Sequence, residues 1–114
     1  MTNVLFDGTV ANTETLYVRV PVHGDAIGLH IGWRDAVSAA NITLELSSSP
    51  DAPALAEGDA WEWVDSGETI SGPSATAAGA ELLHLENVRQ RLARLKIEAT
   101  ADCDLVIYDG AVTD

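Results

Sequence analysis

The sequence predicts an all-β protein, a single small antiparallel β-sandwich. Two segments, 27–33 and 41–47, alternate strictly between apolar residues and polar or small residues, which is the pattern of a strand with one buried face. Turn-forming residues divide the chain into about seven or eight short runs at spacings near ten residues, which is typical of a sandwich. A length of 114 residues suits one domain with its own hydrophobic core.

The first segment of the chain differs from the rest. Residues 1–13 contain few periodic apolar positions, so we expect an N-terminal arm or a first edge strand, followed by the sandwich domain over 14–114. The segment 16–22 is rich in β-branched residues and contains Pro21, which cannot donate a hydrogen bond to a neighbouring strand. This strand is therefore expected to lie at a sheet edge or to end at the proline.

The middle of the chain contains its longest irregular stretches. Residues 48–60 include two prolines and several acidic residues and are expected to form a loop. A strand is predicted over 61–64, a turn at 66–67 and a short strand at 68–71. The alanine- and serine-rich residues 72–79 are expected to form a linker.

The segment 80–99 fits two patterns, and the residues alone leave both open. One set falls at helical spacing among good helix formers: Leu85, Val88, Leu92, Leu95 and Ala99. A second set alternates as two strands separated by a turn at 86–90: Leu83 and Leu85, then Ala93, Leu95, Ile97 and Ala99. The alternatives are a short helix around 80–92 and a pair of strands. If the segment forms two strands, residues 101–103 are expected to form a hairpin turn to a final strand at 105–108.

The charge of the chain is strongly acidic, with 18 acidic residues against 6 basic ones and a formal net charge of −12. Because nucleic-acid binding depends on neutralising phosphates, we expect no nucleic-acid partner. No apolar run approaches the length of about 18 residues that a membrane span requires, and no secretory signal is recognised at the N-terminus, so we expect no membrane partner either. Four of the six basic side chains lie between Arg89 and Lys96. This cluster has two interpretations: a strand face exposed to solvent, or a contact patch for a partner.

Neither catalysis nor metal binding is predicted. The three histidines, His23, His30 and His84, are far apart in sequence and match no metal-ligand spacing. Cys103 is the only cysteine and has no partner for a disulfide or a zinc site. No nucleophile elbow, phosphate-binding loop or dinucleotide motif occurs. We therefore expect a protein that is not an enzyme and binds no cofactor.

The three tryptophans allow two interpretations. Trp61 and Trp63 are two residues apart, hence on one face of a strand, where exposed indoles stack on sugar rings. Buried indoles would instead fill the core. Since aromatic residues make up only 5% of the chain, we expect Trp33 and at least one of the other two to be buried.

Four segments together resemble the small jelly-roll-like accessory proteins of tailed-bacteriophage particles. Four strand patterns recur in that family. They are a strand ending in serine, a W-x-x-V/I-x-G strand, an N-V-x-x-R-x-x-R-L-K strand and a final L-x-V/I-Y strand. The matching segments are Asn41–Ser49, Trp61–Gly67, Asn87–Ile97 and Asp104–Gly110. The resemblance covers roughly residues 27–110. It favours strands over a helix in 80–99.

The resemblance implies a capsid decoration or cement protein, made in the cytoplasm of the host bacterium and located in the virion. Its expected partners are the major capsid protein or another virion protein, and further copies of itself. We expect the contacts at the apolar N-terminal group and the basic segment, namely Val4, Leu5, Phe6, Arg89, Arg91, Arg94 and Lys96. Deleting residues 1–8 is expected to abolish attachment and leave the sandwich folded.

An alternative function is a carbohydrate-binding or host-adhesion module of a phage tail or head appendage. It would use Trp61 and Trp63 as exposed stacking platforms.

Overall fold

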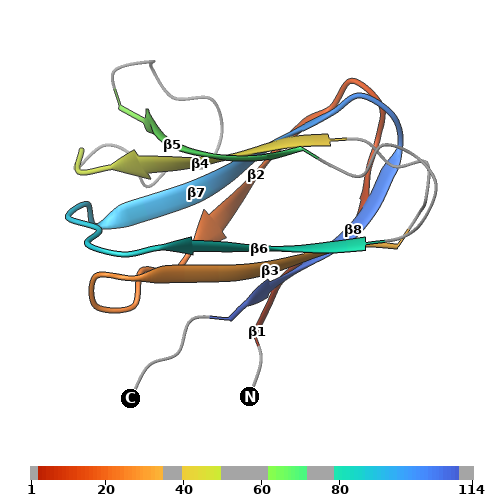
Figure 1. Cartoon of the computed structure of the whole chain (residues 1–114). Helices are drawn as coiled ribbons and strands as arrows, with labels where there is room; N and C mark the ends of the chain where they lie inside the picture. Colours follow the sequence, from red (N-terminus) through yellow and green to blue (C-terminus); the bar gives the residue numbers. More distant parts are fainter. Residues whose placement is uncertain (1–2, 35–39, 50–61, 72–78, 111–114) are drawn as a thin grey trace.

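The structure is a computed structural model, and it describes residues 3–34, 40–49, 62–71 and 79–110. The described residues form eight strands and no helix, arranged as two packed four-stranded antiparallel sheets (Figure 1), which confirms the predicted β-sandwich. In chain order the strands are β1 (Asn3–Val10), β2 (Thr15–Val20), β3 (Ile27–Trp33), β4 (Ala40–Ser47), β5 (Val64–Ser71), β6 (Gly79–Leu85), β7 (Leu92–Ala99) and β8 (Cys103–Asp109).

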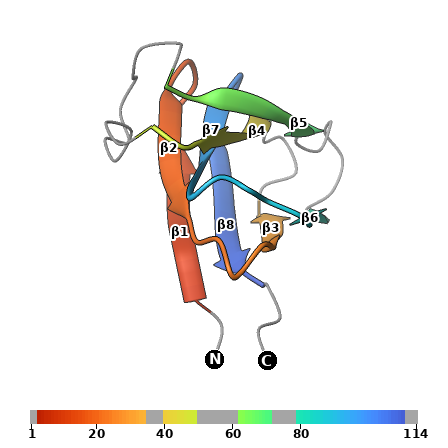
Figure 2. The ribbon, with the colours of Figure 1, turned by 90° about the vertical axis from the view of Figure 1, so that its left-hand side faces the viewer.

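The topology is that of a jelly roll. Sheet A has the strand order β1-β8-β3-β6, and sheet B has the order β2-β7-β4-β5. Figure 2 shows β8 between β1 and β3. The first strand pairs with the last, the second with the seventh, the third with the sixth and the fourth with the fifth. The chain therefore forms one long hairpin that is rolled into two sheets, as in other jelly rolls.

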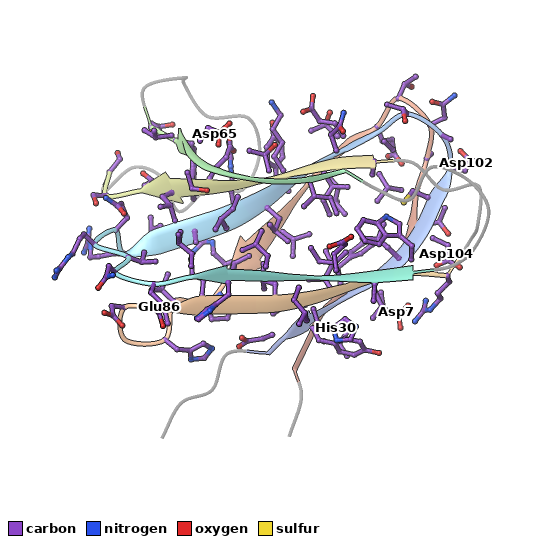
Figure 3. All side chains as sticks on the ribbon, in the orientation of Figure 1. Asp7, His30, Asp65, Glu86, Asp102 and Asp104 are labelled. Atoms are coloured by element: carbon purple, nitrogen blue, oxygen red, sulfur yellow. The ribbon has the colours of Figure 1, made fainter. Side chains whose placement is uncertain are left out.

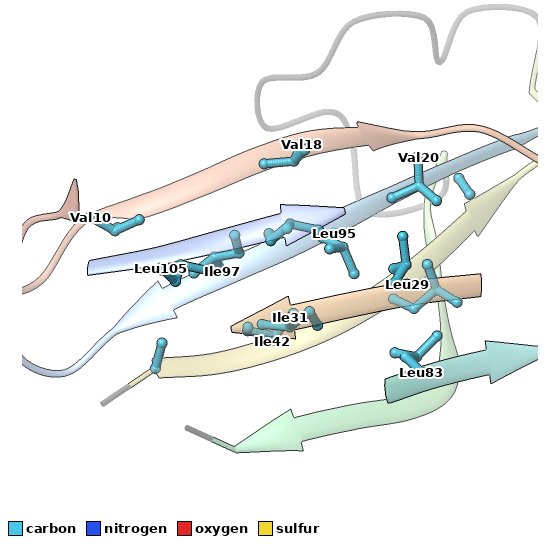
Figure 4. Close-up of a cluster of buried hydrophobic side chains, with 14 of the residues drawn as sticks. Val10, Val18, Val20, Leu29, Ile31, Ile42, Leu83, Leu95, Ile97 and Leu105 are labelled. Carbon is cyan, nitrogen blue, oxygen red and sulfur yellow. The ribbon is translucent and has the colours of Figure 1, made fainter. Parts of the chain in front are cut away.

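The core lies between the two sheets and follows the alternation in the sequence (Figure 4). In β3, Ile27, Leu29, Ile31 and Trp33 are buried, whereas the intervening residues point to the outer side. Strands β4 and β7 supply the opposite half of the core with Ile42, Leu44, Leu95 and Ile97. Each fully buried aliphatic side chain contributes about 1.5–3 kcal/mol, so this alternation is the main source of the fold's stability.

Segment 80–99 forms two strands, and the helical alternative is wrong. Strand β6 ends at Leu85 and β7 begins at Leu92, so the residues at helical spacing are divided between different sheets. Asn87 lies between the strands with a φ of 60°, a left-handed conformation that ends regular structure. Burial and pairing of the period-two residues outweigh the modest helix propensity of this segment.

Two predicted turns are also corrected. Residues 101–103 do not close a hairpin, because β7 and β8 belong to different sheets and the connection crosses from sheet B to sheet A. Residues 66–67 lie within β5, where the pairing with β4 shifts register. Gly67 has a φ of 89°, and its N–H donates to Oδ1 of Asp65 at 2.7 Å. This irregularity is a bulge on an edge strand, a common device for preventing further strand pairing.

The N-terminal segment is an edge strand of sheet A. Residues 3–10 form β1, which pairs with β8 over its whole length. A register shift between Val4 and Phe6 places both Leu5 and Phe6 against the core, and Val10 is buried. We therefore expect deletion of residues 1–8 to destabilise the sandwich, in place of the unchanged stability expected for a free arm.

Candidate functional site

The basic residues predicted as a contact patch do not form one surface. Arg89 and Arg91 are exposed in the connection between β6 and β7, and Lys96 is half-buried in the middle of sheet B. Arg94 is buried: its side chain is 5% exposed, and Nε donates to Oε1 of Glu45 at 2.7 Å. Arg94 is therefore not available to a partner, which corrects that prediction.

The aromatic residues of sheet B explain why Arg94 is covered. Its guanidinium carbon lies 4.1 Å from the ring centroid of Tyr17 and 4.3 Å from that of Trp63. Contacts of this kind between a cation and an aromatic face are attractive, more so when water is excluded. Lying between two rings and paired with Glu45, Arg94 joins β2, β4 and β7 to the residues preceding β5.

Tryptophan burial is confirmed for two of the three indoles. Trp33 is 3% exposed in the core, and Trp63 is 6% exposed against Arg94. Trp61 lies outside the described residues. Because Trp63 is covered, it is not the exposed stacking surface that the carbohydrate-binding alternative requires.

The most exposed apolar residue of sheet A lies on the side of the sheet that faces away from the core. Leu82 in β6 is 76% exposed, and its register partner in β3 is His30. His30 is paired in turn with Tyr108 of β8, and Tyr108 with Val4 of β1, which is 54% exposed. We call Val4, Tyr108, His30 and Leu82 the outer row. Together they carry apolar and aromatic groups across all four strands of the sheet.

The orientation of His30 shows that the outer row faces solvent. Figure 3 shows His30 directed away from the interior of the sandwich. Its ring meets that of Tyr108 edge to face, with 5.6 Å between centroids. The two rings therefore lie in contact at the centre of the face.

A groove lies beside the outer row. Gly28 pairs with His84 on one side, and on the other side its carbonyl accepts a hydrogen bond from the N–H of Gly110 at 2.8 Å. Gly28 and Gly110 carry no side chain, so backbone atoms form the floor of this groove. We call this the glycine groove. Its volume is about 580 Å³, and its walls include His30, Leu82 and His84.

The other glycine on this face of β3 has a packing role instead. A Cβ atom added to Gly32 would lie 3.3 Å from Cγ1 of Val106, a close contact. Val106 occupies the space above Gly32 and is only 7% exposed. Close packing therefore accounts for Gly32, whereas Gly28 is part of the lining of the glycine groove.

Carboxylates lie at both ends of this face, as Figure 3 shows for Asp7 and Asp104 at one end and Glu86 at the other. Arg34 donates a hydrogen bond to Asp7, and its Nη1 lies 3.4 Å from Oδ1 of Asp104. The hydrogen bond from Arg34 lowers the pKa of Asp7 below its usual value, and the same pairing raises the pKa of Arg34. At the other end, Nε2 of His84 is 3.8 Å from Oε1 of Glu86.

The third histidine is used for structure. Nε2 of His23 lies 2.6 Å from Oδ2 of Asp109, whose side chain is 6% exposed. This contact fastens the turn between β2 and β3 to the end of β8. Within the described ranges, no group of three or more histidine, cysteine or carboxylate side chains is placed to hold a metal ion. Nor do these ranges contain a helix suited to crossing a membrane.

The outer row was not predicted, although parts of its signal are visible in the sequence. The alternation in 27–33 places His30 and both glycines on the outer side of one strand. The other members come from strands that are distant in sequence, so only the pairing of β1, β8, β3 and β6 brings them together. No protein-family model and no curated protein sequence matches this chain.

Proposed function

We propose that this chain is a non-enzymatic structural protein that attaches to the surface of a larger assembly, as a capsid decoration protein of a tailed-phage virion. The observation that carries the proposal is the outer row, in which the exposed Val4 and Leu82 on the two edge strands are joined across the sheet by the half-buried Tyr108 and the exposed His30. Contiguous exposed apolar groups on a soluble domain mark interaction sites.

Other properties of the chain fit this role. A jelly roll presents two broad faces, so one face is free to contact the assembly while the other faces solvent. The net charge of −12 favours solubility before assembly. On a capsid, a protein that binds two neighbouring copies of the major capsid protein stabilises the shell, because any ligand that binds only the intact form shifts the equilibrium toward it. The proposal includes contacts between copies of this chain on the shell.

The test uses particles from a phage strain in which the gene for this chain is deleted. Recombinant protein is added to these particles, which are then sedimented and analysed by mass spectrometry. We expect saturable binding at a fixed ratio to the major capsid protein and a higher temperature of DNA release. Absence of the chain from wild-type virions, together with no binding to the deleted particles, would overturn the proposal.

A further inference from the structure

We propose that the outer face of sheet A is the docking side, and that its glycine groove receives an apolar side chain from a basic protein surface. This inference rests on the proposed attachment function and names the face and the chemistry of the partner. Its structural basis is the combination of the outer row, the groove beside it and the carboxylates at both ends of the face.

The groove has the properties of a socket for a side chain. With a volume of about 580 Å³ and one side open to solvent, it is large enough to admit a side chain. The floor is the backbone at Gly28 and Gly110, which lets another chain approach closely. Leu82 stands at its wall, 76% exposed, so an inserted apolar group would bury a surface that the isolated protein leaves in water.

The charges around this face select a basic partner. The four strands of sheet A contain no lysine or arginine. Arg34 follows β3, but it is engaged by both Asp7 and Asp104. At the opposite end Glu86 lines the groove, whereas the exposed Arg89 and Arg91 of the same connection are not among its lining residues. A second copy docked face to face would place like charges together, which costs affinity. A surface with basic residues around an apolar protrusion complements the face.

On the outer side of sheet B the central cation, Arg94, is already enclosed by Tyr17, Trp63 and Glu45. Sheet B has its own opening at the β4–β5 edge, a cavity of about 400 Å³ whose lining includes Leu46, Val64 and Asp65. Val64 in β5 marks this rival opening: it lines the edge cavity, is in register with Leu46 and is 63% exposed, comparable to Leu82 in β6.

The experiment measures binding of variants to the particles that lack this chain. L82K places a cation opposite the proposed basic partner, and G28V fills the groove with a side chain that suits a strand. We expect each to weaken binding by about tenfold or more, the loss typical of one central interface contact. V64K introduces the same charge on sheet B, and we expect binding within about twofold of wild type. L82K and V64K change exposed positions and should keep the wild-type circular dichroism spectrum and melting transition. If G28V alters the melting transition, L82K alone carries the test.

The outcomes separate this inference from the proposed function. If wild-type protein does not bind, the attachment proposal itself fails. If wild type binds and V64K weakens binding while L82K and G28V do not, the β4–β5 edge of sheet B is the docking site and only this inference is overturned. Binding that is unaffected by added salt would contradict a basic partner. A wild-type dimer in sedimentation analysis that L82K dissociates would identify a second copy as the occupant and overturn the inference.

Discussion

The two outer faces of the sandwich use their side chains in opposite ways. On sheet B, Arg94 lies under aromatic rings and is paired with a carboxylate, so the most polar group of the face is enclosed by the protein itself. On sheet A, Leu82 and Val4 remain exposed, and glycine takes the place of a side chain at position 28. The two sheets share one core, but among the described residues the exposed apolar side chains of sheet A lie on its outer face, whereas the exposed Val64 of sheet B lies at the β4–β5 edge in register with Leu46.

This difference shows that residue type alone is a poor guide to which surface binds. Arg94, predicted to contact a partner, packs within the fold, whereas Leu82, of a residue type that usually fills a core, is exposed. What distinguishes the faces is whether neighbouring strands provide groups that cover each side chain. The comparison can be tested by removing a covered group, an edge-strand residue and a surface ion pair.

The largest effect is expected on sheet B. R94A removes the cation and leaves the Glu45 carboxylate, 14% exposed, without its paired charge. Breaking such a pair from one side typically costs about 3–5 kcal/mol, so we expect a loss near that size in urea unfolding. The double variant R94L/E45L should recover part of this loss, because the unpaired charge is removed as well. A stability of R94A within about 1 kcal/mol of wild type would show that the pair is not essential to the face.

An intermediate effect is expected in β1, where inner and outer residues of one strand can be compared. Phe6 packs against the core, so F6A should lower the free energy of unfolding by about 1–3 kcal/mol. Val4 belongs to the outer row and is 54% exposed, so V4A should change it by no more than about 0.5 kcal/mol. Thermal melts of both variants measure the two stability losses. Equal losses would mean that β1 does not separate an inner from an outer side as described.

The smallest effect concerns the charged end of sheet A. The pKa of Asp7 is lowered by the hydrogen bond from Arg34, from a usual value of 3.8. The interaction therefore stabilises the fold above about pH 4, and this contribution is lost as the pH falls through the folded-state pKa. In an NMR titration of the carboxyl carbon, R34Q should raise the pKa of Asp7 toward 3.8. R89Q, which alters an exposed arginine of the connection between β6 and β7, serves as the control and should leave it unchanged.

The sequence predicts the faces of the strands well and their neighbours poorly. Alternation correctly assigns Ile27, Leu29 and Ile31 to the core, because burial of one strand face depends on local spacing. Alternation also places Arg94 on the outer side of β7. Its burial there depends on Tyr17 and Trp63, which come from other segments, so no local pattern reveals it.

The candidate site shows the same limit. His30 and the two glycines of β3 are visible in the sequence as one side of a strand. The outer row becomes visible only when the registers of three strand pairs are known, since Val4, Tyr108 and Leu82 lie in separate parts of the chain. Residue spacing within one segment carries no information about these registers, which depend on long-range pairing.

The position of β8 has a consequence for how the protein is made. Strand β8 lies between β1 and β3 but is synthesised after all other strands of the sandwich, and Asn3 at the start of β1 is paired with Asp109. During synthesis, the backbone of β1 has no neighbouring strand of its sheet to pair with until β8 has left the ribosome. Pairings this distant in sequence fold slowly, in milliseconds to seconds, and leave strand-forming segments open to aggregation. Each chain carries a net charge of −12, and the mutual repulsion of these chains opposes aggregation before β1 is paired.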